Sequence, residues 1–192
     1  MSRAPSPKEQ AIRDRIRPLQ TAKWQADYPW NRLEAAIEEM GEDFGGLELS
    51  PDFQRGHVWT PEQQSHFIEN CLRGVIASDG YLLQFNCPNF DFESSSGDLP
   101  AGLQCLDGLQ RYTAVVRFVR GEIGAFGYRA EELDRTAFCP RRYRMKVAIH
   151  TFQWRVDLLD HYLAINAGGT PHSPEEIARV RQLLVDAAAV QA

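Results

Sequence analysis

Short apolar runs that end at polar turns set the pattern of this chain, and the clearest of these turns leads straight into a helix. Residues 103–106 form one such run, and Asp107 and Gly108 end it. Residues 109–119 then repeat apolar side chains at helical spacing, with Gly121 just past their end. Short strands that pass directly into helices are typical of mixed folds. We therefore expect one α/β (α+β) domain.

The remaining segments continue this alternation of strands and helices. Thr60 is expected to cap a helix that has Pro61 first inside it, Gln63 closing a capping box, and Gly74 near its end. Gly41 is expected to end the helix predicted for residues 30–40. The other predicted helices are residues 30–40, residues 154–165 and a last helix from Pro174 with Ser173 as its cap. The other predicted strands are residues 47–49, 81–85 and 144–150.

Charge is distributed unevenly between the N-terminal segment and the rest of the chain. The net charge of −5 divides into +4 for residues 1–23 and −9 for the remainder. We expect residues 1–28 to form a basic, helical N-terminal arm and residues 29–192 to form a single domain. Apolar residues at helical spacing (Ile12, Ile16 and Leu19) favour a contact within the protein or with another subunit over a DNA-binding arm.

Composition excludes several classes of protein. No apolar run approaches the ~20 residues that cross a bilayer, and the N-terminus lacks a secretory signal, so we expect a cytoplasmic protein without membrane contact. The four cysteines (Cys71, Cys87, Cys105 and Cys139) are scattered, which predicts buried, reduced thiols and no metal ligands. The sequence also lacks a P-loop motif.

Arg111 is the residue that most directly indicates chemistry. It stands in the predicted first helical turn, where the backbone dipole disfavours a cation and unpaired N–H groups favour an anion. An arginine at this place is best explained by a bound phosphate, with Gly108 allowing close approach and Asp107 holding a metal-bound water or orienting Arg111. The plain alternative is a helix start with Asp107 as N-cap and Gln110 as its capping-box partner.

Two further turns carry polar residues. Gln54 and Arg55 follow the short strand at residues 47–49, and Asn166 precedes two glycines at the end of a predicted helix. Each turn is also explained by structure alone, as a surface turn and a helix end. Two arginines at strand ends are suited to converge on a polyphosphate.

In order, these segments resemble the N-terminal domain of GmrS/GmrD-type modification-dependent restriction enzymes, in the ParB/sulfiredoxin-like superfamily. The matching stretches are PDFQRGHVW at residues 51–59, LDGLQR at residues 106–111 and NAGGTPHSPEE at residues 166–176. The resemblance implies a compact ParB/sulfiredoxin-like domain with short strands and helix-initiating phosphate-binding turns. It also implies binding, and in some members hydrolysis, of a nucleoside triphosphate with Mg²⁺.

The resemblance assigns roles to seven residues of this chain. The catalytic candidates are Asp107, Arg111 and Gln54, the candidates for phosphate contact are Arg55, Gly108, Gln110 and Arg111, and Asn166 is an accessory candidate. Leu109 stands where the family usually has glutamine, which puts hydrolysis in doubt more than binding.

We therefore expect a stand-alone nucleoside-triphosphate-binding domain from a restriction or antiviral defence system, with weak Mg²⁺-dependent hydrolysis as an open question. Its expected partners are the nucleotide and either DNA or a nuclease or other defence protein. One alternative is a non-catalytic interaction protein, either a regulator or a phage-encoded inhibitor of host defence. Another is a DNA-binding module that uses the basic arm.

Overall fold

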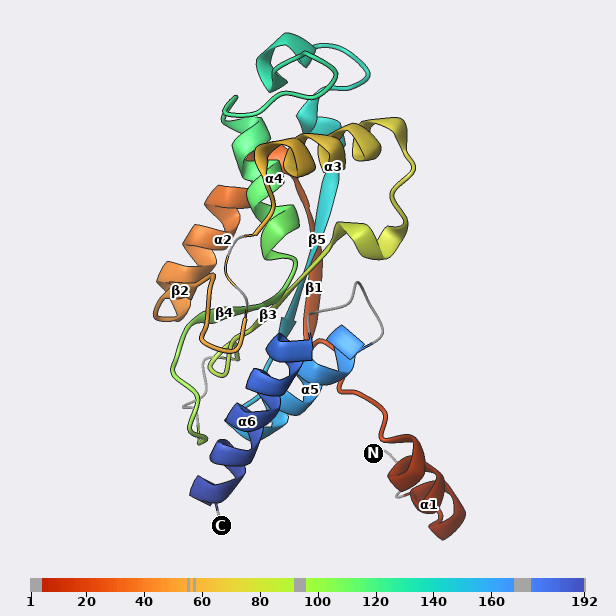
Figure 1. Cartoon of the computed structure of the whole chain (residues 1–192), viewed down its shortest axis with the longest axis vertical. Helices are drawn as coiled ribbons and strands as arrows, with labels where there is room; N and C mark the ends of the chain where they lie inside the picture. The colour runs from red at the N-terminus through yellow and green to blue at the C-terminus, as the bar shows by residue number, and fades with distance from the viewer. Residues whose placement is uncertain (1–4, 55, 57, 92–95, 168–173, 192) are drawn as a thin grey trace.

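A five-stranded mixed sheet runs through this computed structural model, which describes residues 5–54, 56, 58–91, 96–167 and 174–191 (Figure 1). The strands are β1 (Trp24–Pro29), β2 (Leu47–Glu48), β3 (Leu82–Asn86), β4 (Leu103–Asp107) and β5 (Arg144–His150). The helices are α1 (Pro7–Ile16), α2 (Trp30–Phe44), α3 (Pro61–Arg73), α4 (Leu109–Val119), α5 (Arg155–Ala167) and α6 (Pro174–Gln191). Three 3-10 turns complete the described elements: η1 (Ser78–Tyr81), η2 (Ala130–Leu133) and η3 (Pro140–Arg142). The α/β fold class expected from the sequence is confirmed.

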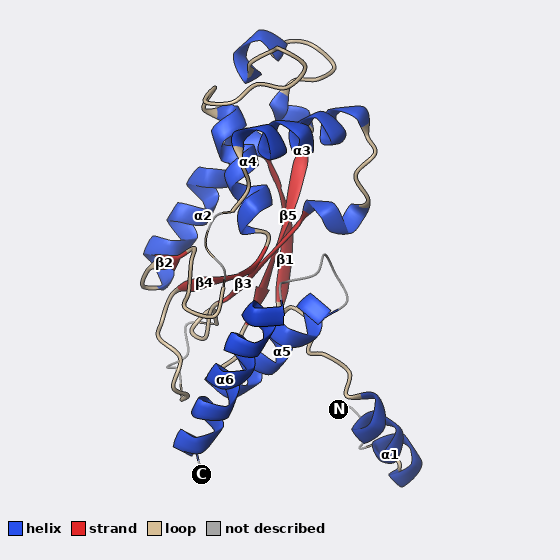
Figure 2. Cartoon of the chain, viewed as in Figure 1, coloured by secondary structure: helices blue, strands red, loops and turns tan. Residues whose placement is uncertain are grey.

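The strands lie in the order β1-β5-β3-β4-β2, so neighbours in the sheet are seldom neighbours in the sequence. β5 pairs antiparallel with β1 and parallel with β3, whereas β4 pairs antiparallel with β3 and parallel with β2. α3 lies at one end of the sheet, and the α5–α6 pair lies at the other (Figure 1, Figure 2). The turn between β4 and α4 lies near the middle of the molecule (Figure 1).

Two hydrophobic clusters hold the helices to this sheet. The first joins α2, α3 and α4 to strand residues such as Leu83 and Phe85, and the second joins α5 and α6 to Leu106 and Phe53. Side chains alternate between the two faces of a strand, so one sheet supplies both clusters. Phe53 belongs to the second cluster, which places the polar turn after β2 against α5 and α6.

Local signals in the sequence predicted α3 correctly. The Thr60 hydroxyl accepts a hydrogen bond from the Gln63 N–H at 3.3 Å, and the Thr60 N–H donates to the Gln63 side chain at 2.9 Å. Gly74 ends the helix with a left-handed φ of +72°. The predicted capping box is therefore confirmed. It was predictable from the sequence because Thr60 and Gln63 lie only three residues apart.

The prediction that Gly41 ends the preceding helix is wrong. α2 continues to Phe44, with Gly45 as its C-cap, and Gly41 lies buried inside the helix. A Cβ at Gly41 would lie 2.8 Å from the Cβ of Leu47, so this position needs glycine for close approach of β2 to α2. A tertiary contact, rather than helix termination, explains the residue.

The N-terminal segment divides into an exposed helix and a strand that the sequence analysis did not anticipate. β1 joins the sheet through β5, whereas α1 has no buried residue and lies apart from the other elements (Figure 1). Ile12, Ile16 and Leu19 are 46%, 68% and 45% exposed, so the contact expected for them within the chain is not formed.

The described helices include none with the length and apolarity needed to cross a bilayer.

Candidate functional site

The turn between β4 and α4 is built on Gly108. Its φ of +98° lies in the left-handed region that favours glycine, and it serves as the N-cap of α4. A Cβ at this position would lie 2.6 Å from Cδ2 of Leu83 and 3.2 Å from the carbonyl oxygen of Leu82. Gly108 therefore lets the turn approach β3, which aims the start of α4 at the loop of residues 51–59.

Arg111 and Asp107 form an ion pair at the start of α4. Nη2 of Arg111 lies 2.5 Å from Oδ2 of Asp107, and the two side chains are 22% and 36% exposed. The Nε atom of Arg111 is buried and forms no hydrogen bond with any residue that the structure describes. The guanidinium is thus oriented by one carboxylate and retains buried donor capacity.

The plain alternative for this turn, a capping box between Asp107 and Gln110, is wrong. Gly108 rather than Asp107 is the N-cap, and no side chain caps the helix. The Asp107 carboxylate is engaged by Arg111, and the Gln110 side chain reaches across to another segment. The short chain between Asp107 and Gln110 permits a capping box, but the ion pair and the neighbouring loop compete for both side chains.

Gln110 ties the described part of the loop at Gly56, Val58 and Trp59 to α4. Its Oε1 accepts hydrogen bonds from the N–H groups of Val58 and Trp59, both at 3.0 Å, and its Nε2 donates to the carbonyl of Gly56 at 3.1 Å. The side-chain amide therefore satisfies three backbone groups that belong to no helix or strand. This bridge joins the loop that follows β2 to the turn between β4 and α4.

We expect Gln110→Ala to release this loop. The substitution removes three hydrogen bonds at a partly exposed site, where each contributes near the lower end of the ~0.5–1.5 kcal/mol range. The free energy of unfolding should therefore fall by about 1.5–2 kcal/mol. Hydrogen exchange at the Val58 and Trp59 amides should accelerate. Gln182→Ala is a matched control, because its amide makes one exposed bond to Asp186 on α6. Unchanged exchange at the two amides would contradict the bridging role.

The Gln54 side chain contacts β4. Its Nε2 donates to the carbonyl of Cys105 at 3.0 Å, and its Oε1 is buried without a hydrogen bond to any described residue. Burial raises the pKa of the Cys105 thiol to about 12, so this cysteine is a neutral packing group and not a nucleophile. Cys105 precedes Asp107 on β4, so Gln54 and the Arg111–Asp107 pair lie on neighbouring segments.

Two arginines that the sequence analysis missed hold the loop from the other side. Arg155 of α5 lies 2.7 Å from the Asp52 carboxylate. Arg179 of α6 donates to the backbone carbonyls of Asp52, Phe53 and Gln54. These contacts span more than a hundred residues of sequence, so no local pattern marks either arginine. The loop is therefore held between α4 and the α5–α6 pair.

The other two predicted site residues are less informative. Asn166 donates from its side chain to the Tyr162 carbonyl at 2.8 Å, and the Tyr162 ring lies 5.2 Å from the ring of Phe53. The accessory candidate is thereby linked to the loop through Tyr162. Arg55 lies outside the described residues. The structure thus brings together Gln54, Asp107, Gly108, Gln110 and Arg111.

A model of a known family covers this whole region. The model described as "GmrSD restriction endonuclease, N-terminal domain" matches residues 37–181, which includes all of the predicted site residues. The chain belongs to the GmrSD N-terminal domain family. This membership associates it with restriction systems, whereas the finer ParB/sulfiredoxin-like assignment stays a prediction. A search of curated proteins found no match, and neither did a search of solved structures.

Proposed function

We propose that this GmrSD N-terminal domain binds the phosphates of a nucleoside triphosphate at the start of α4. The observation that carries the proposal is Arg111, a guanidinium that lies mostly buried in the first helical turn and has a buried Nε without a described partner. A cation is disfavoured at this end of a helix unless an anion offsets the dipole. The Asp107 carboxylate supplies one negative charge beside Arg111, and in this proposal a bound phosphate supplies the further negative charge.

The backbone at this turn supports the same proposal. The first N–H groups of a helix have no carbonyl partner within it. The Leu109 N–H is directed at the Cys105 sulfur, so we assign the phosphate oxygens to the N–H groups of Gln110 and Arg111. Arg111 offers further donors in the fork that matches phosphate geometry. The buried Gln54 Oε1 adds an acceptor beside the site, suited to a water or a ribose hydroxyl.

Mg²⁺ fits this site through the nucleotide rather than through a protein cage. The described residues contain no group of three His, Cys, Asp or Glu side chains arranged to hold a metal ion. Mg²⁺ commonly binds through one or two carboxylates together with substrate phosphates and waters, and we assign the carboxylate role to Asp107. Leu109 is buried in the core and offers no polar group at the helix start. We therefore propose nucleotide binding, and treat hydrolysis as a separate proposal that phosphate release tests.

A thermal-shift series with the four ribonucleoside triphosphates and Mg²⁺ tests the proposal. A nucleotide at one hundred times its Kd should stabilise the protein by about 2.7 kcal/mol, and Arg111→Ala should remove most of this shift. Arg120→Ala is the matched control: it lies at the other end of α4, pairs with Glu34 and should leave the shift intact. Arg55→Ala tests the arginine next to Gln54 in the sequence. A shift that survives in Arg111→Ala would contradict the site. If the shift is lost in this variant, phosphate release from the wild type distinguishes an enzyme from a nucleotide sensor.

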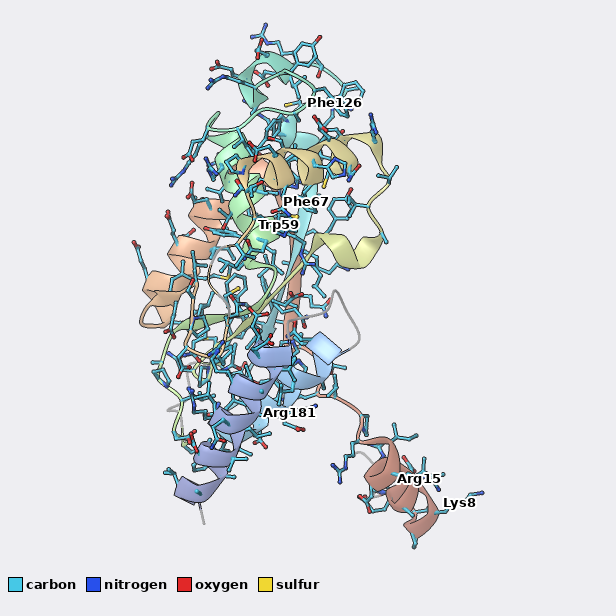
Figure 3. All side chains as sticks on the ribbon, viewed as in Figure 1. Lys8, Arg15, Trp59, Phe67, Phe126 and Arg181 are labelled. Atoms are coloured by element: carbon cyan, nitrogen blue, oxygen red, sulfur yellow. The ribbon has the colours of Figure 1, made fainter. Side chains whose placement is uncertain are left out.

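A second candidate function is suggested by α1. This helix exposes Ile12 and Ile16 together with Lys8 and Arg15, a combination suited to a partner surface (Figure 3). We propose it as the contact of a non-catalytic interaction protein with a nuclease or other defence protein, or with DNA. If no nucleotide stabilises the wild type, this candidate is the better one; loss of DNA binding with added salt would single out the DNA-binding version.

A further inference from the structure

A groove of about 450 Å³ lies along one flank of α3. Its lining is chiefly carbon and comes from Trp59, Glu62, Gln63, His66, Phe67 and Asn70. Figure 3 labels Trp59 and Phe67 close to one another, and their ring centroids lie 5.5 Å apart at a tilt of 52°. An aromatic wall of this size is ample for a planar heterocycle.

One hydrogen bond connects this groove to the start of α4. The Trp59 N–H donates to Oε1 of Gln110 at 3.0 Å, and Gln110 immediately precedes Arg111. The same side chain also bonds the backbone of Val58 and Gly56, which ties these residues to the first turn of the helix. This link to the residue that precedes Arg111 is the basis for assigning the groove and the phosphate site to one ligand.

The rim of the groove carries polar groups that suit the edge of a base. The side-chain amide of Asn70 forms no hydrogen bond with any residue described by the structure, and it offers both a donor and an acceptor. Glu62 and His66 are exposed on the same flank. Gln63 is already used by the capping box with Thr60. Asn70 is thus the side chain best suited to read a base.

We infer that this groove is the nucleobase subsite of the nucleotide, with the base stacked on Trp59 and its edge facing Asn70. The inference rests on the proposed function, since it takes the phosphates to lie at Arg111. Stacking of a base on an aromatic side chain tolerates any base but grows with ring area. Purine nucleotides are therefore expected to bind more tightly than pyrimidine nucleotides.

The test compares ATP, CTP and inorganic tripolyphosphate, each with Mg²⁺, by calorimetric titration. Trp59→Leu should weaken ATP binding at least about five-fold, because base–aromatic stacking is worth ~1–3 kcal/mol, and should leave tripolyphosphate binding unchanged. Trp59→Phe should restore part of the ATP affinity. Asn70→Ala should weaken ATP binding alone, and Asn31→Ala, exposed in the first turn of α2, is its control. Arg111→Ala should weaken both ligands.

The outcomes separate this inference from the proposed function. Equal wild-type affinity for ATP and tripolyphosphate, or unchanged ATP affinity in Trp59→Leu, overturns the base subsite while the phosphate site stands. Wild-type protein that binds neither ligand overturns both. If Trp59→Leu fails to fold, the Trp59→Phe and Asn70→Ala titrations decide: ATP affinity equal to wild type in both variants overturns the subsite.

Discussion

Gly108→Ala is expected to lower the free energy of unfolding by about 3 kcal/mol. A residue with a side chain at a φ of +98° carries strain of ~1–2 kcal/mol, and its Cβ would lie 2.6 Å from Leu83, a fully buried core residue. Overpacking of this kind costs a further ~1–3 kcal/mol, since the carbonyl of Leu82 restricts movement in the other direction. Chemical denaturation with a linear extrapolation measures the loss.

Gly121→Ala is the matched control at the opposite end of α4. Gly121 has a similar left-handed φ of +73°, but a Cβ there would meet nothing within 4 Å. The control should therefore show the backbone strain without the clash. Equal losses in the two variants would mean that the close approach of Gly108 to β3 contributes nothing.

The second large effect is a loss of stability in mild acid, caused by a buried histidine pair. The rings of His150 on β5 and His161 on α5 lie 4.6 Å apart and are 3% and 5% exposed. Burial, and then the neighbouring His161, lower the pKa of His150 from its ordinary 6.5 to about 4. Burial also lowers the pKa of His161, with Asp160 acting in the opposite direction.

The sign of the effect follows from which state binds protons. Below pH 6.5 the unfolded chain protonates His150 while the folded chain keeps it neutral, so stability falls as the pH drops from 6.5 to 4. For His150 alone we expect a fall of about 2 kcal/mol between pH 7 and pH 5. His161 should add to it.

Urea denaturation at pH 7 and pH 5 measures this dependence in the wild type and in a His150→Gln, His161→Gln double variant. The double variant should lose much less stability between the two pH values, because neither amide titrates. His66→Gln, which removes an exposed histidine of α3, should behave as the wild type does. A wild-type stability that is the same at pH 5 and pH 7 would contradict the buried-pair explanation.

Local signals explain why much of the fold was predictable. The capping box of α3, the alternation of β5 and the strand-to-helix turn at Gly108 each depend on residues within about ten positions of one another. The four cysteines were predicted to be buried free thiols, and they are. The same local patterns pointed to Gln54, Asp107 and Arg111, which the structure places on neighbouring segments.

Predictions failed where one segment met another that is distant in the sequence. Gly41 was read as a helix end, whereas its missing side chain admits β2. The alternative interpretation of Gln110 as a capping partner was wrong, because its side chain bonds Val58 and Trp59 instead. Its predicted contact with phosphate stays a prediction. β1 was missed because its pairing with β5 joins residues more than a hundred positions apart.

The sequence by itself thus determined most of the helices and strands of this protein other than β1, its family and the residue types at its candidate site. These depend on hydrophobic periodicity, caps and motif spacing, which act over short stretches of chain. Only the tertiary structure decided what each polar side chain does, including the ion pair of Arg111, the bridge made by Gln110 and the clamp of Arg155 and Arg179 on the loop. A hydrogen bond is satisfied by whichever partner the fold brings within ~3 Å, and the order of residues along the chain does not contain that distance.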